Sequence, residues 1–203
     1  MSYADEFVQF YEGDLGRVAM DREAAYVEQF VEQDDRLLNV GAGVGEMERR
    51  FTDHCVVGLD ASESMLSTAV DRTDAPLVLG DARSLPFPAE TFDVVSFVAT
   101  LEFVPEAETA VSEACRVLAS DGTLVVELMN TQSAYVQANF EMEGSYFQKM
   151  VHRDSMELAD LVTSHLDDAQ IGYFLGIGDG EIYETDSPDE AAVLGVSGTP
   201  ARR

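Results

Sequence analysis

The sequence predicts an α/β fold: a doubly wound, mostly parallel, Rossmann-like sheet of seven strands whose last strand runs antiparallel. Strand-like and helix-like segments alternate along the chain, which is typical of helices packed on both faces of a parallel sheet. The run 92–98 is almost continuously apolar, as expected for a strand that is covered on both faces. The connection between the last two expected strands, residues 178–189, is short enough for an antiparallel hairpin.

Short apolar runs mark the expected strands, which are 37–40, 55–59, 76–79, 92–98, 123–128, 170–177 and 190–196. The expected helices instead carry apolar residues three and four positions apart. These helices are 4–11, 17–32, 46–51, 62–70, 106–119 and 155–165. The stretch 13–16 breaks the first helix from the second, and Asp154 with Glu157 predicts a capping box at the last one. Residues 198–203 are expected to form a frayed end.

The length of 203 residues, with 46% hydrophobic residues, predicts a single domain, 1–203, with its own core. Residues 1–33 are its N-terminal helices. Residues 130–153 have weak periodicity and mix aromatic with polar side chains, so they are expected to be an insertion after the fifth strand. Because parallel strands end at the ligand side of such a sheet, topology delivers this insertion to that side.

A glycine-rich turn between the first two expected strands indicates a ligand site. The strand 37–40 is followed by Gly41, Gly43 and Gly45, and Asp60 ends the next strand. Glycine lets the backbone approach a ligand where a β-carbon would clash. A carboxylate at the tip of the second strand can accept hydrogen bonds from both ribose hydroxyls. The pair predicts a cofactor that contains adenosine, with an ordinary strand–helix turn as the alternative.

The residues after the turn favour S-adenosylmethionine (SAM) over a dinucleotide. The dinucleotide fingerprint G-x-G-x-x-G brings a helix N-terminus onto a pyrophosphate. Here the glycines alternate with other residues, and Glu46 and Glu48 follow at once. Acids in a first helical turn suit the helix dipole but repel a pyrophosphate. The sulfonium of SAM is cationic, and SAM carries no phosphate.

With these residues the chain resembles class I SAM-dependent methyltransferases, particularly the small type 11 group. Asn39 stands where that family usually has Glu or Asp, so it can hydrogen-bond but lacks the charge that would complement the cationic methionine end of SAM. The segment 120–122, Ser-Asp-Gly, replaces the usual Pro-Gly-Gly. The resemblance covers roughly residues 37–128, and its motifs, in the family's order, are Asp60 to Leu66, Gly80-Asp81-Ala82, Leu85-Pro86-Phe87, Phe92-Asp93-Val94-Val95, Glu113 with Arg116-Val117-Leu118, and Asp121-Gly122-Thr123-Leu124.

The resemblance implies roles for single residues in SAM binding. Asp60 would hold the ribose, while Ala61 and Met65 pack against the adenine. Asp81 would accept from the exocyclic amine, and the backbone N–H of Ala82 would face a ring nitrogen. From the residues alone, Met65 also fits simple core packing and Asp81 also fits a turn. The full implied set is Asn39, Gly41, Ala42, Gly43, Gly45, Asp60, Ala61, Met65, Asp81, Ala82 and Val98, the last beside the methionine part.

No catalytic constellation is visible in the sequence, which fits the chemistry of methyl transfer. An in-line displacement mainly needs orientation and desolvation, and a base is needed only for a protonated, weakly acidic acceptor. Glu102 and His152 are the candidate catalytic groups, although Glu102 also fits a solvated loop acid. Tyr11, Glu102 and Tyr146 are the candidates for the acceptor pocket. The insertion 130–153 is expected to close that pocket as a lid, together with the N-terminal helix.

Three functions remain open at this point. The first is a SAM-dependent methyltransferase acting on an unidentified acceptor, with a small molecule favoured over a protein side chain. The second is a non-catalytic SAM-binding module or partner subunit. The third is a nucleotide-dependent oxidoreductase, which the glycine spacing and Glu46 disfavour. The sequence distinguishes neither the atom that is methylated nor the oligomeric state.

The charge of the chain is strongly acidic: 12 basic against 39 acidic residues give a formal net charge of −27. The acids are spread along the chain, which predicts a carboxylate-coated surface as in halophilic proteins. Such a surface disfavours nucleic acids and anionic membranes as partners. The chain lacks a long apolar run and a signal-peptide pattern, so a cytoplasmic protein is expected. Cys55 and Cys115 are expected to be small buried hydrophobes, and no zinc-ligand spacing predicts a metal site.

We expect the melting temperature to rise steeply between low and molar KCl. Self-repulsion of a −27 chain destabilises the compact state at low salt, and molar salt shortens the Debye length to ~3 Å. Thermal unfolding followed by circular dichroism across a KCl series measures the effect. A melting temperature that stays flat over this series contradicts the interpretation as a halophilic surface.

Overall fold

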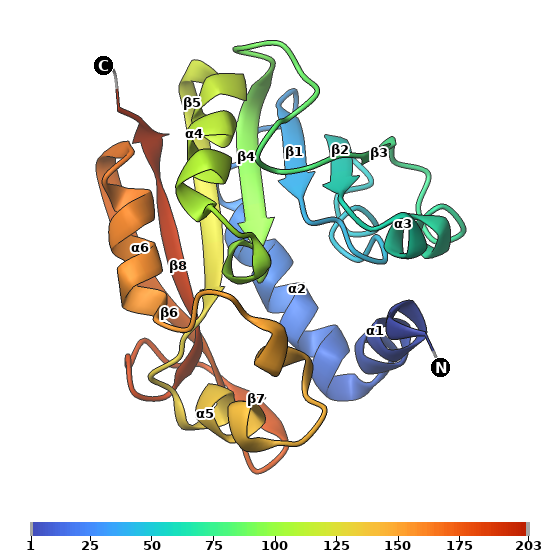
Figure 1. The fold of residues 1–203 in the computed structure, drawn as a ribbon, viewed down its shortest axis with the longest axis vertical. Coiled ribbons are helices and arrows are strands. Elements are labelled where there is room, and N and C mark those ends of the chain that lie inside the picture. Colours follow the sequence, from blue (N-terminus) through green and yellow to red (C-terminus); the bar gives the residue numbers. More distant parts are fainter. Residues whose placement is uncertain (1, 202–203) are drawn as a thin grey trace.

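The computed structural model describes residues 2–201, which fold around one eight-stranded sheet (Figure 1). The strands are β1 (Arg36–Val40), β2 (Cys55–Asp60), β3 (Leu77–Leu79), β4 (Phe92–Val98), β5 (Leu118–Met129), β6 (Leu166–Gly178), β7 (Glu181–Tyr183) and β8 (Ala191–Pro200). The α-helices are α1 (Tyr3–Glu12), α2 (Asp14–Glu28), α3 (Glu63–Ala69), α4 (Ala107–Val117), α5 (Ala134–Glu141) and α6 (Ser155–Thr163). Two 3-10 helices are η1 (Leu101–Phe103) and η2 (Tyr146–Lys149).

The sheet has the strand order β3-β2-β1-β4-β5-β8-β6-β7. The strands from β3 to β5 in this order are parallel neighbours, and β8 lies antiparallel between β5 and β6. The expected mostly parallel sheet with an antiparallel last strand is therefore confirmed. The expected number of seven strands is wrong, because the connection between β6 and β8 forms the additional short strand β7, which pairs with β6.

Helices cover both faces of the sheet (Figure 1). On one face α4 and α6 pack against the strands, and on the other face α2 does. The central strand β4 shows the consequence: Val95 and Phe97 belong to one core and Val94 to the other, each at most 1% exposed. Burial on both faces explains why this strand is almost continuously apolar.

The helix expected at 46–51 is not formed, since residues 43–50 make consecutive turns. Gly41, Gly43 and Gly45 adopt positive φ angles of 94°, 54° and 82°, a region that glycine enters without the steric cost of a β-carbon. Glu46 and Glu48 are buried, at 4% and 1% exposure. Glu46 and Glu48 therefore make contacts inside the protein and do not form the polar face of a helix.

Two further expectations are wrong. Residues 198–200 continue β8, because Gly198 pairs with Leu124 and Pro200 pairs with Leu166. The expected frayed end is thus ordered as far as residue 201, and residues 202–203 lie outside the described part. Cys55 is exposed at the start of β2 and is not a buried hydrophobe.

The insertion 130–153 contains α5 and η2, joined by irregular segments. Asp154 caps α6 as expected, and its side chain accepts hydrogen bonds from the backbone of Met156 and Glu157. The expected capping box is not completed, because the Glu157 side chain makes no return hydrogen bond to the Asp154 N–H. None of the helices within residues 2–201 has the length and apolar character needed to cross a membrane.

Candidate functional site

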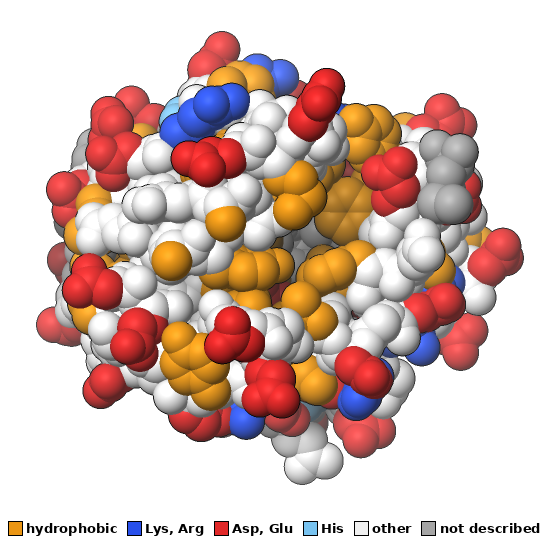
Figure 2. All heavy atoms as spheres, turned by 90° about the horizontal axis from the view of Figure 1, so that it is seen from below, with side chains coloured by type: hydrophobic (Ala, Val, Ile, Leu, Met, Phe, Trp, Pro, Cys, Tyr) orange, Lys and Arg blue, Asp and Glu red, His pale blue; other side chains and the backbone are white. Residues whose placement is uncertain are grey.

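A cleft of about 520 Å³ lies where the carboxyl ends of β1, β2 and β4 meet. Figure 2 views the molecule from this end and shows a hollow lined by hydrophobic side chains, with acidic side chains around it. The glycine turn and the residues after β2 form one wall, and α1 with the insertion contributes the other. Of the predicted cofactor set, the residues that line the cleft are Asn39, Gly41, Ala42, Gly43, Asp60, Ala61, Met65, Asp81, Ala82 and Val98.

Gly41 and Gly45 have different reasons for being glycine. A β-carbon on Gly41 would collide with the Thr100 side chain, so the turn passes close to the end of β4. A β-carbon on Gly45 would lie 3.2 Å from Ala69 and from Thr73. Gly45 is not among the cleft residues, and it allows the turn to pack against α3 and the loop after it. Of the predicted set, Gly45 is the one residue outside the cleft lining.

Asp60 fastens the glycine turn to the end of β2. Its Oδ2 accepts a hydrogen bond from the Gly43 backbone N–H at 2.8 Å, and its Oδ1 accepts one from the Ser62 N–H at 2.8 Å. A carboxylate offers about four lone-pair sites, so two remain for a ligand. Asp60 thus shapes the turn and still presents acceptors to the cleft.

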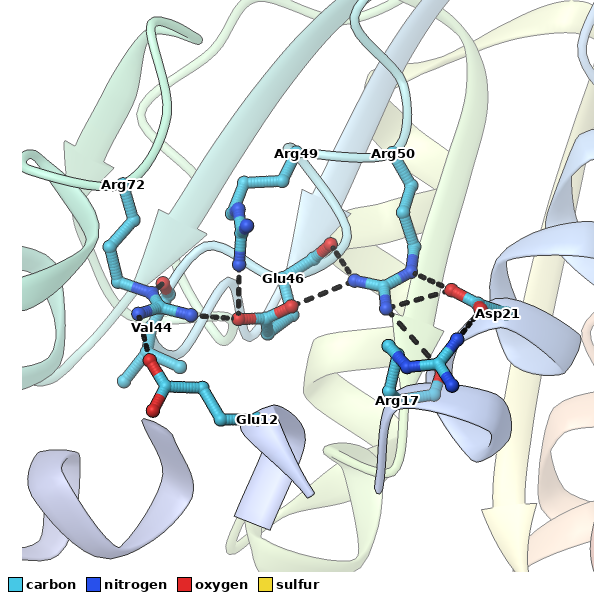
Figure 3. Close-up of polar contacts among 8 residues, drawn as sticks. All are labelled: Glu12, Arg17, Asp21, Val44, Glu46, Arg49, Arg50 and Arg72. Carbon is cyan, nitrogen blue, oxygen red and sulfur yellow. Dashed lines mark hydrogen bonds and ion pairs between the residues drawn. The ribbon is translucent and has the colours of Figure 1, made fainter. Parts of the chain in front are cut away.

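Glu46 is the centre of an ion-pair cluster directly behind the turn (Figure 3). It contacts Arg72, accepts from Arg49 at 2.9 Å and accepts from Arg50 at 2.7 Å. Although burial opposes ionisation, hydrogen bonds from Arg50 and Arg72 hold the pKa of Glu46 below its ordinary value. Because its charge is compensated by arginines, Glu46 does not by itself repel a pyrophosphate, and that part of the sequence argument is wrong.

Asn39 belongs to a buried polar chain beneath the cleft. Its Nδ2 donates to Glu48 Oε1 at 2.8 Å, and its Oδ1 accepts from the Ser96 hydroxyl at 3.2 Å. Burial raises the pKa of Glu48 to about 7, and the charges of Asp60 and Glu46 add to the effect. Glu48 fits there because Gly58 has no side chain: a β-carbon on Gly58 would lie 2.6 Å from Glu48 Oε1. The sequence analysis missed this role of Glu48.

The expected adenine side of the cleft contains Met65, Ala61 and the segment 80–83. Met65 is half-buried and Ala61 is exposed. Asp81 is paired with Arg83, whose Nη2 donates to Asp81 Oδ2 at 2.7 Å. Hydrogen bonds from the Arg83 side chain and backbone lower the pKa of Asp81 to about 2. Asp81 is therefore an ionised acceptor, and Arg83 is an additional cleft residue that the sequence analysis did not name.

Aromatic side chains from α1 and the insertion meet above the cleft. Tyr146 packs edge-on against Phe7, with ring centroids 4.8 Å apart, and lies 4.6 Å from the Phe103 ring centroid. The Lys149 Nζ lies 3.1 Å from the centroid of the Tyr3 ring. The predicted pocket residues Tyr11 and Tyr146 both line this part of the cleft, as do the unpredicted residues Tyr3, Phe7, Phe103 and Lys149.

The two candidate catalytic groups do not line the cleft. His152 directs its Nε2 to the carbonyl oxygen of Val104 at 3.0 Å. Glu102 is 1% exposed, so its interpretation as a solvated loop acid is wrong. Its Oε1 accepts a hydrogen bond from the Met129 N–H at 2.6 Å, and its Oε2 has no partner. Burial raises the pKa of Glu102 to about 7.

A second cavity of about 280 Å³ adjoins the cleft between α1, α2 and the insertion. Ala99, Met129 and Tyr146 line both spaces, so the two are neighbours at the end of β4. Aromatic side chains form much of the cavity's wall, which includes two acids, Glu23 of α2 and the exposed Glu6 of α1. No periodic pattern in the sequence distinguishes Glu23, because the residues beside it in α2 are themselves charged or small.

The strand order and the helices on both faces of the sheet are those of a Rossmann-like methyltransferase fold. A SAM-dependent methyltransferase from Thermotoga maritima, described as a possible histamine N-methyltransferase, matches it with a TM-score of 0.83 at 24% identity, over 97% of this chain and 95% of that chain. At this identity the similarity shows the fold.

Residues 38–126 match a family model described as a methyltransferase domain. A phosphatidylethanolamine N-methyltransferase of Cereibacter sphaeroides is 34% identical over 127 residues, 57% of this chain and 61% of the relative. The ubiquinone/menaquinone biosynthesis C-methyltransferase UbiE from a strain of the same organism is 35% identical over 102 residues, 45% of this chain and 41% of the relative. The chain spans about half the length of the curated relatives it matches. The matched family model and both of these relatives are named as methyltransferases, and the similar structure from Thermotoga maritima is described as SAM-dependent.

The buried carboxyl of Glu102 predicts that stability falls as the pH rises. Its pKa lies at about 7 in the folded chain against an ordinary 4.5, so the folded state holds the proton more tightly. The stabilisation is complete below about pH 4.5 and is lost as the pH passes through 7. We expect Glu102→Gln to reduce this loss by up to roughly 3 kcal/mol.

Urea unfolding of both proteins at a series of pH values in molar KCl measures the slope. Glu23 and Glu48 also have pKa values raised to about 7 by burial, so part of the slope should remain in the variant. Glu108→Gln, at an exposed position of α4, is the matched control and should leave the slope unchanged. Equal slopes in Glu102→Gln and the unsubstituted chain would show that Glu102 does not hold a proton in the fold.

Proposed function

We infer that the chain is a SAM-dependent methyltransferase whose acceptor is a small organic molecule. The observation that carries this proposal is the position of Asp60, which ends β2, fastens the glycine turn and keeps free acceptor sites toward the cleft. The cleft volume of 520 Å³ lies within the range of about 300–1,000 Å³ for small-molecule sites. The match of residues 38–126 to a methyltransferase domain supports the same conclusion.

The residues present fit each chemical part of SAM. Asp60 would accept from the ribose hydroxyls, and the apolar side chain of Met65 would lie against the adenine ring. Asn39 offers an amide at the end of β1, where the methionine part would lie. Glu48 adds the carboxyl that Asn39 lacks, because it is hydrogen-bonded directly behind it. Burial raises the pKa of Glu48 to about 7, so a ligand that is cationic at its reacting end would favour the ionised form of this carboxyl.

The structure disfavours a dinucleotide for a different reason from the one the sequence suggested. Dinucleotide sites place a pyrophosphate on the N-terminus of the helix after the glycine turn. Here residues 43–50 form turns, so no helix begins at that point. A non-catalytic SAM-binding module is disfavoured by the second cavity, because it provides room for an acceptor beside the cofactor cleft.

SAM would supply an activated methyl group on a sulfonium, which is already a good leaving group. The protein's task is then to hold the acceptor in line and to keep water out. Aromatic side chains of α1, η1 and η2 perform the second task here, since they meet over the cleft. The carboxylates that line the cleft are paired with arginines or with the backbone. The other side chains there that can exchange a proton are Lys149 and the phenols of Tyr3, Tyr11 and Tyr146.

We expect Asp60→Ala to weaken SAM binding by about 1.5–3 kcal/mol, because two ribose hydroxyls lose a charged acceptor. Isothermal titration calorimetry with SAM in molar KCl measures the affinity. Asp71→Ala removes an exposed carboxylate just after α3 and serves as the control for general charge effects. Unchanged SAM affinity in Asp60→Ala would show that Asp60 does not bind the cofactor. A loss of SAM affinity of the same size in Asp71→Ala would show that the loss in Asp60→Ala comes from net charge alone.

We also propose that α1 and the insertion 130–153 act as a lid on the acceptor side. Tyr146 and Lys149 of the insertion contact Phe7 and Tyr3 of α1 across the mouth of the cleft. Contacts of this kind between two surface segments are few and can open locally. The lid would admit the acceptor and then exclude water from the methyl group.

Hydrogen exchange with and without SAM should show increased protection in residues 4–17 and 130–153 when the cofactor binds. Ordering of the two segments against each other closes their backbone amides to solvent. The helix α4, which packs on the opposite face of the sheet, is the internal control. Protection confined to the glycine turn and Asp60 would mean that the two segments are a fixed cover.

The acidic surface supports adaptation to high salt as a further part of this proposal. Figure 2 shows acidic side chains spread over the whole of the face that it displays, with basic side chains far fewer. Acidic side chains that are distributed in this way do not form a local binding site for a basic partner.

A further inference from the structure

The cavity beside the cofactor cleft combines aromatic side chains with two carboxyls, the half-buried Glu23 and the exposed Glu6. Tyr11, Tyr135 and Tyr146 are among the rings that line it, and Glu23 projects into it from α2. Its volume of 280 Å³ suits a small organic molecule. Aromatic faces carry a negative quadrupole and attract cations, most strongly where water is excluded.

Behind Glu23 the interior holds two more carboxyls that have no cation beside them. Glu127 of β5 is 0% exposed, and both of its carboxylate oxygens lack a hydrogen-bond partner. Glu102 is 1% exposed and leaves Oε2 without a partner. Burial raises the pKa of Glu127, and the charges of Glu23 and Glu102 raise it further, so the three carboxyls lie within electrostatic reach of one another.

Ionised carboxyls in such surroundings lower the stability of the fold, and the size of this loss depends on what fills the cavity. Uncompensated buried carboxylates are destabilised by several kcal/mol in general, and they hold protons instead. No salt bridge within residues 2–201 involves Glu23, Glu102 or Glu127, and the nearest compensating charge on Glu23 comes from Arg50. A cation that entered the cavity would complete the missing pairing, whereas an anion would be repelled.

Two of the rings that line the cavity already contact an ammonium group, that of Lys149, which lines the adjoining cleft and not the cavity itself. The only lysine of the chain, Lys149, places its Nζ 3.1 Å from the centroid of Tyr3 and 5.4 Å from that of Tyr146. Both rings line the cavity as well as the cleft. Their negative faces are thus turned to where an ammonium can sit.

We propose that this cavity binds the methyl acceptor as an organic cation, a protonated amine on an apolar or aromatic body, with Glu23 pairing with the ammonium. The inference rests on the proposed methyltransferase function. Glu127 and Glu102 do not touch the ligand, and a bound ammonium would favour the ionised forms of these two carboxyls. An amine must lose its proton before its nitrogen can act as a nucleophile, and the Glu23 carboxylate is placed to accept that proton.

The test is calorimetric titration of the full chain in molar KCl near neutral pH with three matched probes. These are 2-phenylethylamine, the neutral 2-phenylethanol and the anionic 3-phenylpropanoate. Molar salt screens the acidic surface but screens a buried pair much less. We expect the amine to bind on the order of 10-fold more tightly than the alcohol, and the carboxylate to bind not at all. Equal binding of amine and alcohol overturns the proposal.

Glu23→Gln should weaken the amine on the order of 10- to 100-fold and leave the alcohol unchanged. Glu28→Gln removes the same charge from an exposed position of the same helix and should change neither. A similar loss of amine binding in Glu28→Gln overturns the assignment of Glu23. Glu127→Gln replaces a carboxyl that a bound ammonium can ionise by an amide that stays neutral, so it should weaken the amine by a smaller factor. This second variant tests the proposal if Glu23→Gln does not fold.

A separate titration with S-adenosylhomocysteine distinguishes this proposal from the one on which it rests. If S-adenosylhomocysteine binds equally to the unsubstituted chain and to Glu23→Gln while the amine binds to neither, only the cationic acceptor is refuted. If S-adenosylhomocysteine itself does not bind, the proposed function fails as well. Binding of both ligands to the unsubstituted chain, with loss of the amine alone in Glu23→Gln, supports the proposal.

Discussion

The glycine turn depends on the ion-pair cluster at Glu46, and the cofactor cleft depends on the turn. In dinucleotide-binding Rossmann sites a helix follows the glycine turn, and its N-terminus binds the pyrophosphate. Here no helix follows, and three arginines converge on one carboxylate that is 6% exposed in its side chain. Arg72 also donates to the Val44 carbonyl, and Arg50 also pairs with Asp21 of α2 (Figure 3). The cluster thus joins α2, the turn and the segment after α3, which no local hydrogen-bond pattern would join.

The sequence predicted those parts of the molecule whose cause is local. The run 92–98 is almost continuously apolar, as is typical of a strand covered by helices on both faces. The structure forms β4 over the same residues. Asp60 was identified because a carboxylate at the end of a strand after a glycine turn has few other uses, and the structure places it in the cleft. The antiparallel last strand followed from a connection too short for a crossover, although the extra strand β7 inside that connection was missed.

Buried carboxyls account for most of what the sequence could not predict. Glu46 and Glu48 have the pattern of a polar first turn, and Glu102 has that of a loop acid, because composition does not show which acids a fold encloses. Enclosure depends on partners that are distant in sequence: Gly58 makes room for Glu48, and the Met129 N–H lies 27 positions from Glu102. The end at 198–200 escaped prediction for a similar reason, since its order comes from pairing with β5 and β6 and not from its own residues.

The placement of the few basic residues ties these observations together. With 12 basic against 39 acidic residues, the chain cannot pair each acid, so the position of each cation distinguishes one carboxylate from another. Cations are concentrated at Glu46, where an ionised carboxylate holds the turn, and at Asp81 in the cleft. No basic side chain pairs with Glu127 in the described residues, and both of its carboxyl oxygens lack a hydrogen-bond partner. The cavity that Glu23 lines has aromatic side chains in its wall. Because leaving a buried carboxyl unpaired costs stability, and an apolar residue of similar volume would avoid that cost, a ligand that brings its own positive charge gives this arrangement a physical reason.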